Sequence, residues 1–401
     1  MSYDIKGELF FVGKRQKADR EIDMEAKVEN KKERIEYFDY LKAYAIFLVL
    51  VCHREVLFIR MAGIIIPAFL FIAGYNFRLP DGSFAGYVKK QVKRLLVPFW
   101  QAMLVYIIME LVRGPLFGYG TAEKTIVSGL LNMIYGAGGK VPCIGSMGQY
   151  LREALMAGGQ GTMVNLILPT NCQLWFLPVL FSALLIFYFF VKYRNKNIFF
   201  DFAFIAGCLL FTFAAARPDL PQLPYSFEVG SYAAAVMAVG YLCRERNFFA
   251  DENDKKHILG LLFAVPFGVV YRFVNVGWVM SSPEPHGVVI NFISGLCYVY
   301  LAVMVCKLLC RLPFRRLKLV LSKVGKNTLP IYLWHFVCFF LMDVVYHFIF
   351  GAEFSPGPFD IEYFYYGSFL YRWGTILATI AILTLWGERK KKARVYFSPD
   401  K

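Results

Sequence analysis

Ten long apolar runs, separated by short polar gaps, constrain this chain more than any other feature of its sequence. Hydrophobic residues make up 58% of the 401 positions and charged residues only 18%, and a single soluble core cannot bury that much apolar surface. Most runs approach the roughly 20 residues that a helix needs to cross a bilayer. The sequence therefore predicts an all-α integral membrane protein with a bundle of about ten transmembrane helices, and it excludes a soluble enzyme or a disordered chain. The runs lie at about 38–59, 62–79, 95–113, 173–191, 198–216, 228–243, 257–273, 287–310, 327–350 and 366–386.

The basic residues between the runs predict how the chain crosses the bilayer. Alternate gaps and the C-terminal tail hold 25 Lys and Arg residues, whereas the opposite gaps hold 5. Basic residues favour the cytosolic side of a membrane, so we expect both termini in the cytosol and a multi-pass protein of the plasma (inner) membrane. The net charge of +15 then reflects topology and attraction to the lipid bilayer. No nucleic-acid-binding motif accompanies it, and no nucleic acid is expected as a partner.

The chain divides into three expected segments. Residues 1–37 form a polar cytosolic segment, residues 38–386 the transmembrane domain, and residues 387–401 a basic cytosolic tail. Within the transmembrane domain, residues 114–172 fall on the outer side and hold twelve glycines. Loops of this length inside a compact fold are usually functional, so we expect half-helices and loop covering an outward-facing cavity.

The nine cysteines show no metal-binding spacing, and no metal is expected. Most of them suit free packing thiols in apolar helices. Cys143 and Cys172 differ, because both lie in the long outer loop, where a disulfide can persist. The sequence leaves a disulfide and two free thiols both open, since it gives no distance between the sulfur atoms.

Polar side chains recur along one face of the first apolar run. Lys42 and His53 are eleven residues apart, a rotation of about 1100°, which places them within about 20° of each other and about 16 Å apart along the axis. The orientation puts Lys42 near the cytosol, where a cation suits a phosphate-bearing donor. It puts His53 in the outer half, where an imidazole suits proton transfer. The alternative is that Lys42 and the segment His53–Glu55 only anchor the helix in the two headgroup layers.

The same segment resembles the first span of the acyltransferase 3 family, whose members O-acylate envelope sugars and polymers. That family carries a basic residue, ten residues and then a histidine, as in FDYLKAYAIFLVLVCHRE at 38–55. The resemblance extends from about 34 to 386 through IPAFLFIAGYNF, KKQVKRLLVPFW, QLWFLPVLF and GKNTLPIYLWHF. Two positions depart from the family pattern: Ala73 stands before Gly74 where a serine is usual, and Gln91 precedes Arg94 where two arginines are usual.

The resemblance implies transfer of an acyl group, with acetyl as the expected case, from cytosolic acyl-coenzyme A. The acceptor would be a hydroxyl on an outward-facing envelope saccharide or lipid-linked glycan. His53 is expected as general base or transient acyl carrier, and Glu55 is placed with it among the catalytic residues. The donor site is expected to comprise Lys42, Lys90, Lys93 and Arg94, and the acceptor site Arg54, Trp175, Arg272, His335 and Arg372.

Several of these residues have simpler alternatives. The basic cluster at 89–94 also suits a positive-inside signal, Trp175 an aromatic belt, and His335 a structural bond between helices. Arg372 lies about six residues inside the last run, and a buried arginine needs a carboxylate or the substrate as its partner. The sequence does not decide between these roles.

Two other functions fit the same sequence. The first is a transporter or flippase for a small polar substrate, without acyl-transfer chemistry, since the resemblance extends to the membrane halves of serine-uptake proteins. In those proteins the membrane half is linked to a racemase, and we expect no such soluble catalytic domain here. The second is a polymer-synthesis partner with a degenerate site.

The basic asymmetry generates a labelling prediction. A cysteine introduced by Ser128→Cys, in the predicted outer loop, is expected to react with an impermeant maleimide on intact cells, because 25 of the 30 basic residues counted between runs lie on the other side. Labelling that requires cell lysis would reverse the predicted orientation.

Overall fold

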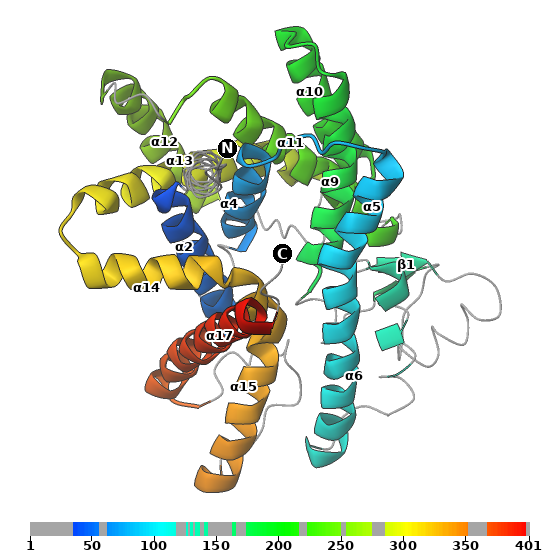
Figure 1. Ribbon diagram of the computed structural model, residues 1–401, viewed down its shortest axis with the longest axis vertical. Helices are drawn as coiled ribbons and strands as arrows, with labels where there is room; N and C mark the ends of the chain where they lie inside the picture. The colour runs from blue at the N-terminus through cyan, green and yellow to red at the C-terminus, as the bar shows by residue number, and fades with distance from the viewer. Residues whose placement is uncertain are drawn as a thin grey trace, which may run out of the picture. The chain divides into compact units, whose positions relative to one another are not determined.

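The structure is a computed structural model dominated by helices (Figure 1). It describes residues 35–55, 62–117, 126, 129–130, 133–136, 140–142, 163–165, 174–215, 223–249, 254–274, 285–351 and 367–397. The long helices are α2 (Glu36–Cys52), α4 (Ala62–Tyr75), α5 (Phe84–Gln91), α6 (Val97–Phe117), α9 (Phe176–Tyr193), α10 (Ile198–Ala215), α11 (Phe227–Glu245), α12 (Asp254–Val274), α13 (Val288–Arg311), α14 (Arg315–Lys326), α15 (Thr328–Phe350) and α17 (Phe369–Phe397). A π-helical turn at Val92–Leu96 joins α5 to α6, and 3-10 turns at Pro224–Ser226 and Pro285–Gly287 precede α11 and α13.

The helices confirm a multi-pass membrane protein. Within the described ranges, seven helical segments are long and apolar enough to cross a bilayer, because each contains a stretch of 18 residues with the high mean hydropathy that the hydrocarbon core requires. The remaining expected spans are shorter: α2 has 17 residues, and the apolar parts of α4 and α12 are Ile65–Tyr75 and His257–Val270. The number of about ten spans therefore stays a prediction. The seven segments are Phe84–Val112, Phe176–Tyr193, Ile198–Ala215, Pro224–Glu245, Val288–Arg311, Thr328–Phe350 and Phe369–Lys391.

Three elements differ from the sequence-based expectation. The first helix ends at Cys52 rather than continuing to 59. The gap after α13 contains α14, a twelve-residue helix that crosses beside α2 (Figure 1). The long loop contributes one antiparallel pair of short strands, β1 (Lys140–Pro142) and β2 (Met163–Asn165). Cys143, Cys172 and Ser128, together with most of residues 1–37, lie outside the described residues.

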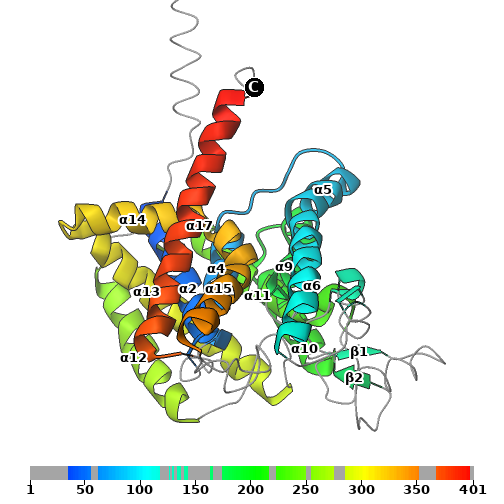
Figure 2. The same cartoon turned by 90° about the horizontal axis from the view of Figure 1, so that it is seen from below.

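Helix α11 is the centre of one group of helices. It packs against α4, α9 and α10, and nearly all of its side chains from Val229 to Ala238 are buried. A second group brings α15 against α17 and α6, and the last turns of α17 extend past the neighbouring helices (Figure 2). Helix α13 packs on both α4 and α12.

Glycines let α4 and α11 approach until their backbones touch. A Cβ atom at Gly240 would lie 2.2 Å from the carbonyl oxygen of Phe71, and one at Gly74 would lie 2.0 Å from that of Met237. Small residues are the usual means of close helix packing in membranes. The close contact with α11 therefore explains why position 74 is a glycine, independently of Ala73 before it.

This contact predicts a position-specific effect of one methyl group. Gly240→Ala is expected to lower the melting temperature in detergent, because its Cβ cannot fit unless α4 moves away, and overpacking typically costs about 1–3 kcal/mol. Gly207→Ala in α10 is the matched control, since nothing lies within 4 Å of its added Cβ, and alanine is the better helix former. Equal melting temperatures for the two variants would contradict the packing described here.

Candidate active site

The polar residues at the end of α2 lie in a tight turn rather than in a continuing helix. The helix ends at Cys52, and the next amides bond back into its last turn: His53 N–H to the carbonyl of Val49 at 3.2 Å, and Glu55 N–H to that of Val51 at 2.8 Å. His53 is half-buried, whereas Arg54 and Glu55 are buried. Two adjacent charges of opposite sign thus enter the protein interior, and each requires a partner there.

Arg54 finds its partner on α15. Its Nη2 donates to Asp343 Oδ1 at 2.7 Å, and both side chains are fully shielded from solvent. The hydroxyl of Tyr371 donates to the same oxygen at 2.8 Å, and the guanidinium lies 4.4 Å from the centre of the Phe339 ring. Arg54 is thereby neutralised inside the protein, and the bond ties the end of α2 to α15.

Glu55 finds its partner on α17. Arg372 Nε donates to Glu55 Oε1 at 2.9 Å, and Arg372 Nη1 donates to the carbonyl of Gly367 at 2.9 Å. The carboxylate that a buried Arg372 requires is therefore present. Since α15 and α17 pack against each other, the two ion pairs join α2, α15 and α17 at one place.

His53 lies beside a second histidine at this junction. The ring centres of His53 and His335 are 5.3 Å apart, and the ring of Phe336 lies 4.9 Å from His53. The imidazole of His53 makes no hydrogen bond within the part of the chain that the structure describes. Neither ring nitrogen is therefore bonded to a described residue.

The buried His335 has a defined tautomer. Its Nδ1 lies 2.8 Å from the carbonyl oxygen of Tyr332, and a ring nitrogen bonds to a carbonyl only as a donor, so Nδ1 carries a proton. Its Nε2 has no hydrogen-bond partner among the described residues. A neutral His335 therefore presents an unused acceptor next to His53.

Aromatic side chains connect the histidine pair to Trp175. The hydroxyl of Tyr332 accepts a hydrogen bond from the amide of Phe176 at 3.2 Å, and the two rings are 5.9 Å apart, edge to face. Trp175, directly before α9, is half-buried and packs edge-on against Phe176 at 6.2 Å. The structure thus brings Trp175, His335 and His53 into one region.

Lys42 lies at the other end of α2. Its Nζ is 2.8 Å from Asp39 Oδ1, and about a quarter of its side chain is exposed, against 4% for Asp39. Helix α14 covers this end, because a Cβ atom at Gly325 would lie 2.0 Å from the carbonyl oxygen of Asp39. Lys42 is therefore a partly exposed cation held by a buried carboxylate.

The comparison with protein families places these residues in a known context. A family model described as an acyltransferase domain matches residues 35–386, which is most of the chain. The chain belongs to the acyltransferase 3 family. The resemblance seen in the sequence is thereby confirmed, and the chain is a membrane acyltransferase by family. Neither the comparison with curated proteins nor that with solved structures gave a match.

In this acyltransferase the basic cluster of 90–94 lies apart from Lys42. Lys90 lies in the last turn of α5, and Lys93 and Arg94 lie in the π-helical turn. All three side chains are exposed. α5 and α2 lie on different sides of α4 in Figures 1 and 2. Gln91 turns the other way: it is 4% exposed, and its Oε1 has no partner within the described ranges. The extra residue of a π turn shifts which side chains face inward, and such turns are frequent at functional sites.

Two further observations concern Arg272 and possible metal ligands. The backbone of Arg272 lies in α12, which packs on α13, while its side chain lies outside the described part of the structure. Among the described residues, no group of three His, Cys, Asp or Glu side chains could hold a metal ion.

The structure adds three residues to those that the sequence singled out as site residues: Asp343, Tyr371 and Tyr332. Asp343 carried a usable signal, since a charge in the outer half of a span requires an opposite charge at similar depth. Tyr332 and Tyr371 carried none, because tyrosines are common in apolar runs and only the folded chain places their hydroxyls.

Proposed function

We propose that this protein transfers an acyl group, with acetyl as the expected case, from acyl-coenzyme A to a hydroxyl of an outward-facing envelope saccharide or lipid-linked glycan. The observation that carries the proposal is the pair His53 and His335, whose ring centres lie 5.3 Å apart at the buried junction of α2, α15 and α17. Family membership supports acyl transfer as the reaction. The donor and the acceptor belong to the proposal.

His53 is the proposed general base. It takes the proton of the acceptor hydroxyl while that oxygen attacks the carbonyl carbon of the thioester. The new carbon–oxygen bond forms as the carbon–sulfur bond breaks, and the proton leaves with the thiol of coenzyme A. The ring nitrogens of His53, which bond to no described residue, support this role. His335 is suited to bind the acceptor through its Nε2, which has no hydrogen-bond partner among the described residues.

Lys42 and the separate basic cluster of Lys90, Lys93 and Arg94 are both proposed to bind the donor. Phosphates are bound by Lys and Arg through charge-assisted hydrogen bonds, and these side chains are exposed or partly exposed. Coenzyme A is an extended molecule, so its phosphates can lie near Lys42 while the thioester reaches His53, about 16 Å along the helix. The donor would then bind on the side that the basic gaps predict to be cytosolic.

The charged residues around the histidines are proposed to position them. Arg54 and Glu55 are both engaged in ion pairs, so they hold the turn that carries His53 rather than meet the substrate. Arg372 does the same from α17. Trp175 is half-buried near the histidine pair and is suited to stack on a sugar ring; Arg272 stays a proposed acceptor contact.

The two ends of α2 predict separable losses. His53→Ala is expected to reduce turnover of acetyl-coenzyme A by about 10²–10⁴-fold, the usual contribution of general acid–base catalysis, with little change in donor affinity. Lys42→Ala is expected to weaken donor binding instead. Both are measured by release of coenzyme A and by isothermal titration with the purified protein.

His257→Ala is the matched control, because that histidine lies on α12 and bonds to Tyr300 instead. Each variant must first show the melting temperature of the parent protein. Full acyl transfer by the His53→Ala protein would exclude His53 as the base. Absence of any coenzyme A release by the parent protein would favour the transporter alternative.

A further inference from the structure

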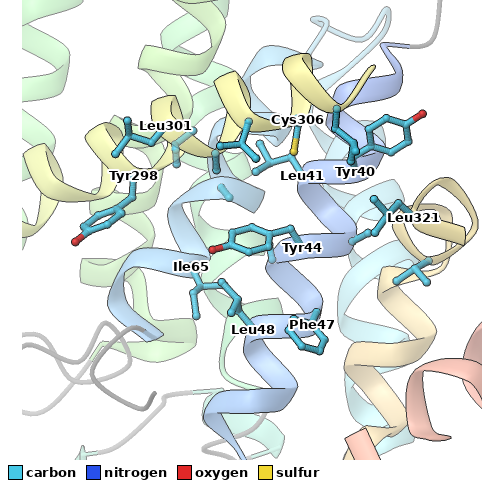
Figure 3. A pocket seen from close by; sticks show the side chains of 18 of the residues that line it. Tyr40, Leu41, Tyr44, Phe47, Leu48, Ile65, Tyr298, Leu301, Cys306 and Leu321 are labelled. Atoms are coloured by element: carbon cyan, nitrogen blue, oxygen red, sulfur yellow. The ribbon is translucent and has the colours of Figure 1, made fainter. Parts of the chain in front are cut away.

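A partly open apolar cavity lies between α2, α4, α13, α14 and α17 (Figure 3). Its volume is about 530 Å³, and none of the described residues that line it is charged. Its lining from α2 includes the large side chains of Tyr40, Tyr44, Phe47 and Leu48. At about 100° per residue these lie roughly opposite the stripe of Lys42 and His53, so the cavity and the histidine pair are separate sites.

The wall formed by α14 has two chemically distinct faces. Val320, Leu321 and Val324 line the cavity, whereas the basic residues of this helix gather on the other side of it. The helix contains no acidic residue. Its basic residues are Arg315, Arg316, Lys318, Lys323 and Lys326.

Two of these cations are exposed at the edge of the apolar face. Arg316 and Lys323 are seven residues apart, two turns along the same side of the helix, and both side chains are exposed. Neither forms an ion pair or hydrogen bond through its side chain within the described ranges. Lys318, by contrast, is used internally, since its Nζ donates to the carbonyl of Cys310 at 2.7 Å.

We propose that this cavity binds the acyl chains of an anionic phospholipid, whose phosphate lies against Arg316 and Lys323. An apolar space bordered by exposed cations on a short amphipathic helix matches both parts of such a lipid. A coenzyme A head group or a saccharide fits poorly, because the lining offers no charged group and only a few hydroxyls. A zwitterionic lipid would fill the space without using the cations.

The bound lipid would brace the cytosolic end of α2. Helix α14 touches the backbone of α2 where Gly325 meets Asp39, and the lipid chains would fill the space beside that contact. The proposal rests on the cavity and on α14 alone, so it does not depend on the reaction proposed above.

Native mass spectrometry tests the proposal. The purified protein, in detergent with equal phosphatidylglycerol and phosphatidylcholine, is expected to retain phosphatidylglycerol preferentially. Arg316→Gln with Lys323→Gln is expected to reduce that preference about 25-fold, since each cation near an anionic group changes binding roughly fivefold. The matched control is Lys192→Gln with Lys196→Gln, two exposed cations at the end of α9 and between α9 and α10. This control should leave the lipid preference unchanged.

A cavity-filling variant separates the cavity from the charge. Ala302→Phe, or Val305→Phe at the exposed rim, is expected to lose both lipids while keeping the parent melting temperature. No preference for phosphatidylglycerol by the parent protein would overturn the proposal. So would an unchanged preference in the Arg316/Lys323 variant, or unchanged lipid retention in both cavity-filling variants.

Discussion

Two adjacent ion pairs at the end of α2 determine how the rest of the site is arranged. Arg54 and Asp343 are 289 residues apart in the sequence, Glu55 and Arg372 are 317 apart, and all four side chains are buried. A single charge in this environment would be strongly destabilising. The turn after Cys52 can therefore lie only where α15 offers a negative charge to Arg54 and α17 a positive charge to Glu55.

The position of the histidines follows from this constraint. His53 directly precedes Arg54, so fixing the arginine against Asp343 also fixes the imidazole beside His335, which lies two turns earlier on α15. The hydroxyl of Tyr371 and the ring of Phe339 hold the same arginine. A turn tied to two helices in this way holds its side chains more reproducibly than a free loop does, which suits the role proposed for His53.

Much of the helix order could be predicted from the sequence, because apolar runs and helices coincide. The runs at 198–216, 287–310 and 327–350 are α10, α13 and α15 to within one residue at each end. α14 was missed because its twelve residues lie in a basic gap and show no long apolar run. The first helix was predicted seven residues too long, since the turn that ends it depends on partners in α15 and α17 and not on local sequence.

The site could be predicted only in part. The spacing of Lys42 and His53 and the requirement of Arg372 for a carboxylate are local properties of the chain. Which carboxylate pairs with which arginine is not, because Arg54 and Asp343 are 289 residues apart and periodicity says nothing about contacts between helices. The ion pairs of Arg54 and Glu55 are therefore visible only in the folded protein.

A double-mutant cycle tests the central claim most directly. The unfolding free energy in mixed micelles would be measured for the parent protein, Arg54→Gln, Asp343→Asn and the double variant. Each single change should cost about 3–5 kcal/mol by leaving a buried charge unpaired, and the double variant should be more stable than additivity predicts by at least about 1 kcal/mol. Additivity to within about 0.5 kcal/mol would show that the two residues do not interact, and the described placement of His53 would then be wrong.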